Sequence, residues 1–243
     1  MAETRATNSL FFLDEFDLSC ETASLSTALT IPALDTTTLC ASAMTSIAGL
    51  PSAAVTMAGY ISGLVAGNVE FEMEASLPGT GSRTIATLYG TDTTGCPAYI
   101  LDNAFDNDFT TDFPIDGILS VSGGWMTQDG VKRGLRVYNG TISSTGTQSS
   151  VDFGAQGTAG GKGWLFVTAI TGGATNADID IESSATEGGV YVSEGTFTFS
   201  AVGVQTMTLS GTVDRWLRIN TTDLGTATNF AVTIVAQIAG VSG

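Results

Sequence analysis

The sequence predicts an all-β protein with one short helix, organised as two consecutive domains. Thr, Ser, Val, Ala and Gly are abundant among the 243 residues and there are only five prolines, a composition typical of many strands and turns. Hydrophobic residues make up 43% and charged residues 13% of the chain, which is enough apolar surface for a core and argues against disorder. Short apolar segments separated by turn residues recur through the second half, as in a β-sandwich.

Alternation of apolar and polar residues marks the strands of the first half. Residues 10–19, 23–31 and 53–61 have this pattern, the last with one side formed by Val55, Met57, Gly59 and Ile61. Residues 68–75 show it most clearly, with apolar side chains on one face and three carboxylates, Glu70, Glu72 and Glu74, on the other. We therefore expect a half-buried antiparallel strand there.

The short helix is predicted at residues 81–90. Ile85, Leu88 and Tyr89 have helical spacing and Gly90 can end the helix. Residues 98–102 and 117–137 continue as strands, with turns predicted at Gly123-Gly124 and Asp129-Gly130.

A polar, turn-rich stretch after Tyr138 predicts the domain boundary. We assign residues 1–140 to a first domain, 141–150 to a linker and 151–243 to a second domain. The second domain holds short strand segments at steady spacing, namely 163–170, 177–183, 195–200, 205–213, 215–220 and 230–238. This spacing predicts a small β-sandwich or jelly roll.

Charge and residue types exclude several functions. The 24 acidic and 8 basic residues give a net charge of −16, which argues against capture of nucleic acid or of an anionic membrane. The chain has no histidine, so Ser-His-Asp and Cys-His catalysis and His-ligated zinc are absent. Cys20, Cys40 and Cys96 are widely spaced and predict free, mostly buried thiols in a reducing cytoplasm. We expect no enzyme activity, no cofactor and no metal site.

Two segments could carry chemistry, and each has a plainer structural explanation. Residues 102–116 contain five aspartates but lack the EF-hand spacing, so a solvated acidic loop is favoured over a calcium site or a glycosidase carboxylate pair. Arg215, Trp216 and Arg218 could bind a sugar by stacking and bidentate hydrogen bonds. The alternative is that Trp216 packs in the sandwich and both arginines pair with acids.

The stretch from Glu21 to Gly63 carries no charge after Asp35. It could be a membrane span, part of a core or a segment that another copy of the chain covers. Its many Thr and Ser residues and Pro51 make a transmembrane helix a poor explanation. The N-terminal segment has acids where a signal peptide needs a basic start. We therefore expect folding in a cytosol, without a membrane, and the residues alone leave open whether the segment belongs to a core or is covered by another copy of the chain.

This stretch resembles the tail tube proteins of siphophages. The matching positions are Leu34, Asp35, Thr37, Thr38, Ile47, Ala48, Gly49, Leu50, Val55, Met57 and Gly59. The chain departs from the family where Ala43, Met44 and Thr45 replace a basic loop residue and where Ser52 replaces an acid. In the second half, Ile181 to Ser184 and Gly211 to Arg218 resemble a C-terminal β-domain attached to tail tube subunits of some phages.

The resemblance implies a tail-tube-type β-sandwich or partial barrel followed by a decoration domain. It implies a structural virion protein, assembled in the host cytoplasm, whose hexameric rings stack into a non-contractile tail conduit through which DNA passes without specific binding. Implied partners are further copies of the chain, the tape measure protein and the tail terminator and tip proteins. Implied interface residues are Leu34, Asp35, Thr37, Thr38, Ile47, Gly49 and Leu50, and implied lumen residues are Glu70, Glu72 and Glu74.

Two other functions stay open at this point. One is a carbohydrate-binding or adhesion protein whose contact residues are Arg215, Trp216 and Arg218. The other is a capsid decoration protein. Glycan binding without rings would favour the first, whereas rings that cap a capsid without stacking would favour the second.

Overall fold

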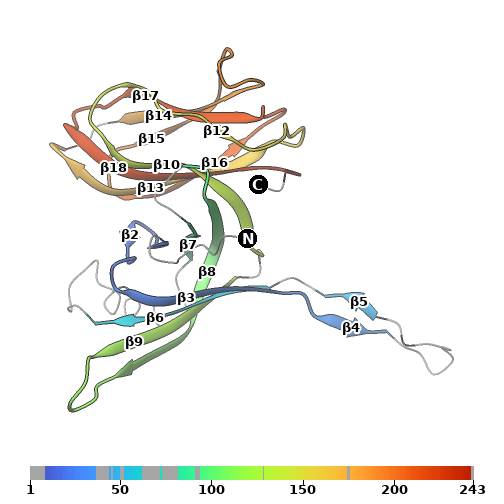
Figure 1. Cartoon of the computed structure of the whole chain (residues 1–243), viewed down its shortest axis with the longest axis vertical. Coiled ribbons are helices and arrows are strands. Elements are labelled where there is room, and N and C mark those ends of the chain that lie inside the picture. Colours follow the sequence, from blue (N-terminus) through green and yellow to red (C-terminus); the bar gives the residue numbers. More distant parts are fainter. Residues whose placement is uncertain are drawn as a thin grey trace. The chain divides into compact units, whose positions relative to one another are not determined.

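The computed structural model describes residues 9–36, 44, 46–49, 52–61, 72, 82–90, 94–127, 129–173 and 176–241. Every named element is a strand, which confirms the all-β prediction (Figure 1). Within these described residues, no helix has the length and apolar character needed to cross a membrane.

The chain forms two compact units, and neither is a continuous stretch of sequence. Unit 1 consists of Met1–Asp17, Ala86–Ile100 and Lys132–Gly243, and unit 2 consists of Leu18–Ile85 and Leu101–Val131. The linker predicted at residues 141–150 contains the end of strand β10 (Lys132–Ile142) and strand β11 (Gly146–Thr147). The structural division therefore differs from one drawn at that linker.

Unit 1 is built on a two-sheet sandwich, in line with the strands predicted for the second half. One sheet has the order β16-β13-β18-β10, and the other has the order β11-β17-β14-β15, with β12 also paired to β17 (Figure 1). The further strands of this sandwich are β12 (Val151–Asp152), β13 (Gly161–Thr171), β14 (Ala177–Ser184), β15 (Val192–Phe199), β16 (Gly203–Leu209), β17 (Trp216–Asp223) and β18 (Asn229–Ile238).

The sandwich core lies between the two sheets and comes from alternate residues of each strand. Leu165 and Val167 of β13 pack there with Ile179, Ile181, Leu217, Ile219, Phe230 and Val232. The intervening residues Trp164 and Phe166 are also fully buried, because they pack with Phe12, Leu88 and Ile100 on the other face of the β13 sheet. Both faces of β13 are therefore covered, which explains its nearly continuous apolar sequence.

Strands β1 (Leu10–Leu13) and β2 (Phe16–Asp17) form a short hairpin in unit 1. Asp14, in the turn, has a φ of 52°, a conformation that Asp tolerates better than most residues. The register pairs Phe12 directly with Asp17, so these two side chains lie on the same face of the hairpin.

Unit 2 contains an antiparallel sheet with the order β3-β6-β9-β8. Its strands are β3 (Thr22–Thr30), β6 (Ser52–Tyr60), β9 (Ser120–Thr127) and the second half of β8 (Pro97–Asp112). Ala53, Val55, Met57 and Gly59 are buried on one face of β6, which confirms the predicted alternation of that strand. Strands β4 (Ala33–Asp35) and β5 (Ser46–Ala48) pair with each other and extend the ribbon formed by β3 and β6 (Figure 1).

Two local predictions in this region are wrong. Residues 81–90 contain strand β7 (Arg83–Leu88) in place of the predicted helix, because Thr84, Ile85 and Thr87 are β-branched and the strand pairs with its neighbour β8. Gly123 and Gly124 lie inside β9 and do not form a turn. The predicted turn at Asp129-Gly130 does connect β9 to β10, and Gly130 has a φ of 70°.

The cysteines are less buried than predicted. Cys20 is exposed and Cys96 is half-buried, and both are free thiols. Cys40 lies outside the described residues.

Candidate functional site

Among the described residues, the sheet of unit 2 is open at one edge, along strand β3. This strand pairs with β6 through residues Thr22 to Thr30, and no described strand pairs with its other side. Its sequence, TASLSTALT, has no charge and no proline, the two devices that usually protect an edge strand from pairing with another chain. Leu29 and Ile31, at the far end of this edge, expose 57% and 56% of their surface.

In the part of the chain that the structure describes, the opposite edge of the sheet, along β8, is open beyond its pairing with β7. Residues Phe105 to Asp112 pair with β9. On its other side β8 pairs with β7, which begins at Arg83, and no further described strand lies against that edge. The four-stranded sheet therefore has two unpartnered edges among the described residues.

One face of this sheet is polar and open to solvent. The register aligns Ser26, Thr56, Gly124 and Asp108 across the four strands. Asp108, Thr110 and Asp112 are exposed on β8, and a bulge at Asn107 sets their side chains on this face. The face is formed by Ser24, Ser26, Ala28, Thr30, Ser52, Ala54, Thr56, Ala58, Tyr60, Phe105, Asp108, Thr110, Asp112, Ser120, Ser122, Gly124 and Met126. It carries two carboxylates and no basic residue, and we call it the acidic sheet face.

Of the implied lumen residues, only Glu72 is described by the structure, and it is not part of the acidic sheet face. Glu72 has helical backbone conformation and only 4% of its surface is exposed. A residue with helical backbone does not continue a pleated strand, so the prediction that Glu72 lies on a strand face is wrong. Its carbonyl oxygen accepts a hydrogen bond from Arg83 Nη2 at 3.3 Å. Glu70 and Glu74 lie outside the described residues.

The implied interface residues that the structure describes lie on the β4–β5 hairpin. Leu34 and Ile47 are directly paired across the hairpin and expose 50% and 58% of their surface. Asp35 is exposed beside them, and Gly49 donates its backbone N–H to the carbonyl of Pro32 at 2.6 Å. A Cβ at Gly49 would lie 2.9 Å from Pro32 Cγ, which explains a glycine there. Thr37, Thr38 and Leu50 lie outside the described residues.

The predicted sugar-contact residues of unit 1 are engaged with acids that sequence spacing could not identify. Arg215 donates two hydrogen bonds to the carboxylate of Asp152, at 2.6 and 2.5 Å. Arg218 donates to Glu182 at 2.7 Å and stacks on the Tyr191 ring at 3.8 Å. Trp216 is half-buried, with the Arg215 guanidinium 5.7 Å from its ring. Sugar binding by this cluster stays a prediction.

The hydrogen bonds from Arg215 hold the pKa of Asp152 down at about 2, helped by the backbone N–H of Gly154. The same pairing raises the pKa of Arg215. Burial raises the pKa of Tyr138, whose hydroxyl donates to the carbonyl of Thr141.

The aspartate-rich segment at residues 102–116 is not the solvated loop that we predicted, because most of it belongs to β8. Asp102 and Asp106 expose only 7% and 8% of their surface, whereas Asp108, Asp112 and Asp116 are exposed. Residues an even number apart share one face of a regular strand, so the bulge between Asp106 and Asp108 is what moves the later side chains to the other face. No group of three or more acidic, cysteine or histidine side chains suited to a metal ion occurs among the described residues.

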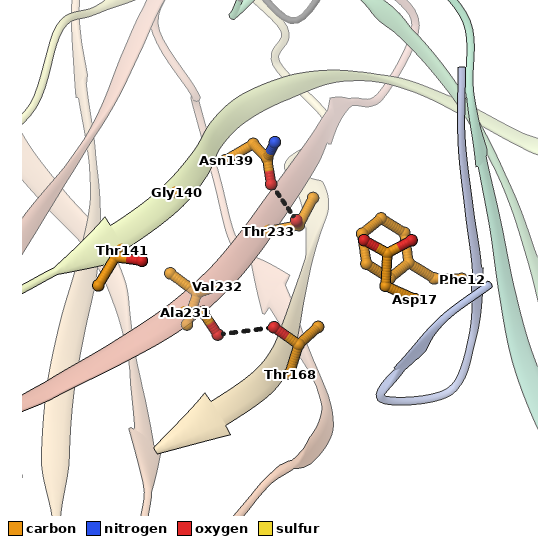
Figure 2. A pocket seen from close by; sticks show the side chains of 9 residues that line it. All are labelled: Phe12, Asp17, Asn139, Gly140, Thr141, Thr168, Ala231, Val232 and Thr233. Carbon is orange, nitrogen blue, oxygen red and sulfur yellow. Dashed lines mark hydrogen bonds between the residues drawn. The ribbon is translucent and has the colours of Figure 1, made fainter. Parts of the chain in front are cut away.

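A polar cavity in unit 1 was not predicted from the sequence. It has a volume of about 180 Å³ and is lined by Phe12, Asp17, Asn139, Gly140, Thr141, Thr168, Ala231, Val232 and Thr233 (Figure 2). Thr233 donates a hydrogen bond to Asn139 Oδ1 at 2.7 Å, and Thr168 donates to the carbonyl of Ala231 at 3.3 Å. The lining residues come from four separate parts of the chain, so no sequence motif could have marked the cavity.

No protein-family model and no curated protein matches the sequence. Three solved structures show a distant likeness in fold. A chain of the virion of a native gene transfer agent particle has a TM-score of 0.42 and 10% identity, covering 54% of this chain and 98% of that chain. A chain of the PVC sheath-tube complex of an extracellular contractile injection system has a TM-score of 0.43 and 14% identity, covering 54% and 90%.

The third is the SPP1 Dit protein, described as part of the hub adsorption apparatus of phages that infect Gram-positive bacteria. Its TM-score is 0.37 at 11% identity, covering 94% of this chain and 98% of that chain. Likenesses at this distance carry no argument about function, which has to rest on the sheet edges, the acidic sheet face and the cavity.

Proposed function

We propose that this chain is a structural virion protein, the major tail tube subunit of a non-contractile phage tail, and that it polymerises as stacked rings around a conduit for DNA. The observation that carries the proposal is the open four-stranded sheet of unit 2. It has two unpartnered edges among the described residues, and the β3 edge is long and free of charge and proline. Such an edge pairs readily with a strand of another chain.

Ring closure follows from the two different edges. Pairing of β3 in one subunit with the open edge of β8 in the next is a head-to-tail contact, and such contacts close into rings when the rotation between subunits allows it. Every copy then has both edges covered, and the sheets of all subunits join into one closed wall. The family resemblance implies six subunits in each ring.

The acidic sheet face supplies a suitable lining for that wall. DNA binding depends on Lys and Arg neutralising phosphates, and this face carries Asp108 and Asp112 without any base. Repulsion between like charges would keep a passing duplex from adhering. Asp108 and Asp112 therefore take the place of Glu72 as proposed lumen residues.

The β4–β5 hairpin supplies a second contact in this proposal. Leu34 and Ile47 place two exposed apolar side chains side by side, and contact with a neighbouring subunit would remove them from water. Tape measure, terminator and tip proteins are the further partners proposed, and the sandwich of unit 1 is proposed as the decoration domain.

The test is to block the β3 edge. Ala28 is exposed on this strand, so Ala28→Lys adds a charged side chain to the edge without disturbing the core. Ala185→Lys is the matched control, because Ala185 is exposed between β14 and β15 in unit 1. Negative-stain electron microscopy and sedimentation velocity of concentrated protein should show rings or tubes with a central channel for the wild type and the control.

The Ala28→Lys protein should remain monomeric with an unchanged circular dichroism spectrum. Assembly of Ala28→Lys at the wild-type concentration threshold would contradict pairing through β3. A wild-type protein that stays monomeric and folded at every concentration and salt level tested would contradict the tube proposal itself.

A further inference from the structure

The cavity in unit 1 is lined by the β1–β2 hairpin and by neighbouring strands β10, β18 and β13, at a bulge in β13. The β1–β2 register places Phe12 and Asp17 side by side at one wall (Figure 2). On the opposite wall, β10 and β18 pair Asn139 with Thr233. Thr168 is the extra residue of a bulge between Val167 and Ala169 in β13, and bulges of this kind redirect a side chain toward a site.

The charge of the lining decides which ligands the cavity can accept. None of its nine lining residues is basic and Asp17 is acidic, so the lining offers no positive charge to phosphates, carboxylates or nucleotides. One carboxylate is also too few for a divalent cation such as Ca²⁺, which prefers six to eight oxygen ligands and usually several carboxylates. The suitable ligand is therefore uncharged and polar.

The polar side chains of the lining are suited to hydrogen bonds with the hydroxyl groups of a ligand. A threonine hydroxyl both donates and accepts hydrogen bonds, an asparagine amide does so through its two ends, and a carboxylate accepts from two donors at once. The cavity has three threonines, one asparagine and one aspartate. Thr233, 1% exposed, donates to Asn139 Oδ1 and so fixes the orientation of the amide.

The size of the cavity suits a ligand of one ring. At about 180 Å³ it has room for about six water molecules, each of which occupies roughly 30 Å³ in the liquid. Ala231, which is half-buried, places apolar surface beside the polar groups, whereas Phe12 and Val232 expose only 1% and 2% of their surface. A sugar ring also combines C–H surface with hydroxyls. We propose that this cavity binds a single neutral sugar ring, with two adjacent hydroxyls of the sugar donating to the Asp17 carboxylate.

This inference is independent of ring assembly, because every lining residue belongs to unit 1. It also differs from the sugar contact predicted at Trp216, since none of the residues of that cluster lines the cavity. The two sites can therefore be separated by mutation.

The test is saturation-transfer NMR on the full chain with D-glucose, D-galactose, D-mannose and N-acetyl-D-glucosamine, each as a separate probe at millimolar concentration. At least one sugar should receive saturation from the protein. Asp17→Asn should weaken its binding at least about fivefold, which corresponds to roughly 1 kcal/mol, and Thr168→Val should weaken it as well. Asp17 is exposed, so its replacement leaves the core intact.

Glu187→Gln is the control, because it also removes one exposed carboxylate from unit 1 and should leave binding unchanged. A further variant, Trp216→Ala, should also bind normally. The proposal is overturned if none of the four sugars gives a signal, or if the signal survives both cavity variants. It is equally overturned if Trp216→Ala alone removes the signal, or if inorganic phosphate or CaCl₂ binds at Asp17 while the sugars do not.

Discussion

Asp152 and Arg215 form the best-defined ion pair among the described residues of unit 1. The pair is bidentate, and it ties β12 to the start of β17 next to the backbone pairing of Asp152 with Trp216. Both side chains are partly exposed, at 34% and 46%, so solvent screens the pair and its contribution to stability is modest. The pair can be detected because it makes the unfolding stability of the protein depend on pH.

The stability that this ion pair contributes should decrease as the pH falls. The pKa of Asp152 is about 2 in the folded chain because Arg215 donates to the ionised carboxylate, whereas an unfolded Asp has a pKa of about 3.9. A depressed folded pKa gives stability that is present above the unfolded value and is lost as pH falls through the folded value. Urea unfolding should therefore show that Asp152→Asn is less stable than the wild type at pH 7, with a difference that shrinks between pH 4 and pH 2.

The exposed carboxylate of Glu187 provides the comparison, since Glu187→Gln removes a charge without breaking this pair. A difference between Asp152→Asn and the wild type that stays constant from pH 7 to pH 2 would show that the ion pair does not form in solution.

The sequence predicts that Arg215 and Arg218 can pair with acidic residues, but it does not show which acidic residues these are. That Arg215 and Arg218 pair with acids was one of two explanations left open by the sequence. The acids are 63 and 36 residues away along the chain, and only the pairing of β17 with β12 and β14 brings them together. The cavity was missed for the same reason, since Asp17, Thr168 and Thr233 meet only through sheet pairing.

At the level of elements, strand β8 buries some aspartates of one acidic segment and exposes the others. Along Pro97–Asp112 the early aspartates are buried, whereas Asp108 and Asp112 share the exposed face of the unit 2 sheet. The bulge at Asn107 shifts the register there. A Cβ at Gly124, opposite Asp108, would lie 2.8 Å from Asn107 Oδ1, which explains why β9 carries a glycine next to the bulge.

The acidic sheet face should decide whether assembled protein binds DNA. Asp108→Lys reverses one of its two charges, so tubes of this variant should retain double-stranded DNA in a filter-binding assay at low salt, whereas wild-type tubes should not. Glu187→Lys, with the same change of net charge in unit 1, should leave DNA retention at the wild-type level. Equal retention by both variants would mean that net charge matters and that the face does not line the conduit.

Strand prediction succeeded where one face is buried over a long segment. The alternation of Val55, Met57 and Gly59 predicted β6 because the strand has two different faces. The pattern failed for β7, where Ile85, Ala86, Thr87 and Leu88 are all buried and the spacing of a few apolar residues fits a helix equally well. It also failed at Glu72, whose buried side chain and helical backbone do not fit the alternation of its neighbours in the sequence.

For the molecule as a whole, net charge opposes assembly. Each chain carries −16, and stacking many copies concentrates this charge. Salt screens such repulsion, with a Debye length of about 30 Å at 0.01 M and about 10 Å at 0.1 M. The proposed rings should therefore form at a several-fold lower protein concentration in 200 mM NaCl than in 10 mM NaCl, as measured by light scattering.

Sucrose at matched osmolality serves as the control, because it changes water activity without screening charge, and it should not reproduce the effect of salt. Assembly that weakens as NaCl rises would show that ion pairs between subunits dominate over repulsion.

The division into two discontinuous units also has a consequence for biosynthesis. All residues of unit 2 have been translated once Val131 has been added, so its open edges can form on a nascent chain. Unit 1 has to wait for β18, which pairs with both β10 and β13 and follows them in the sequence. The ribosome would thus present a sheet ready to pair while the remainder of the same chain is still emerging, and neighbouring ribosomes on one messenger RNA would bring such sheets within reach of each other.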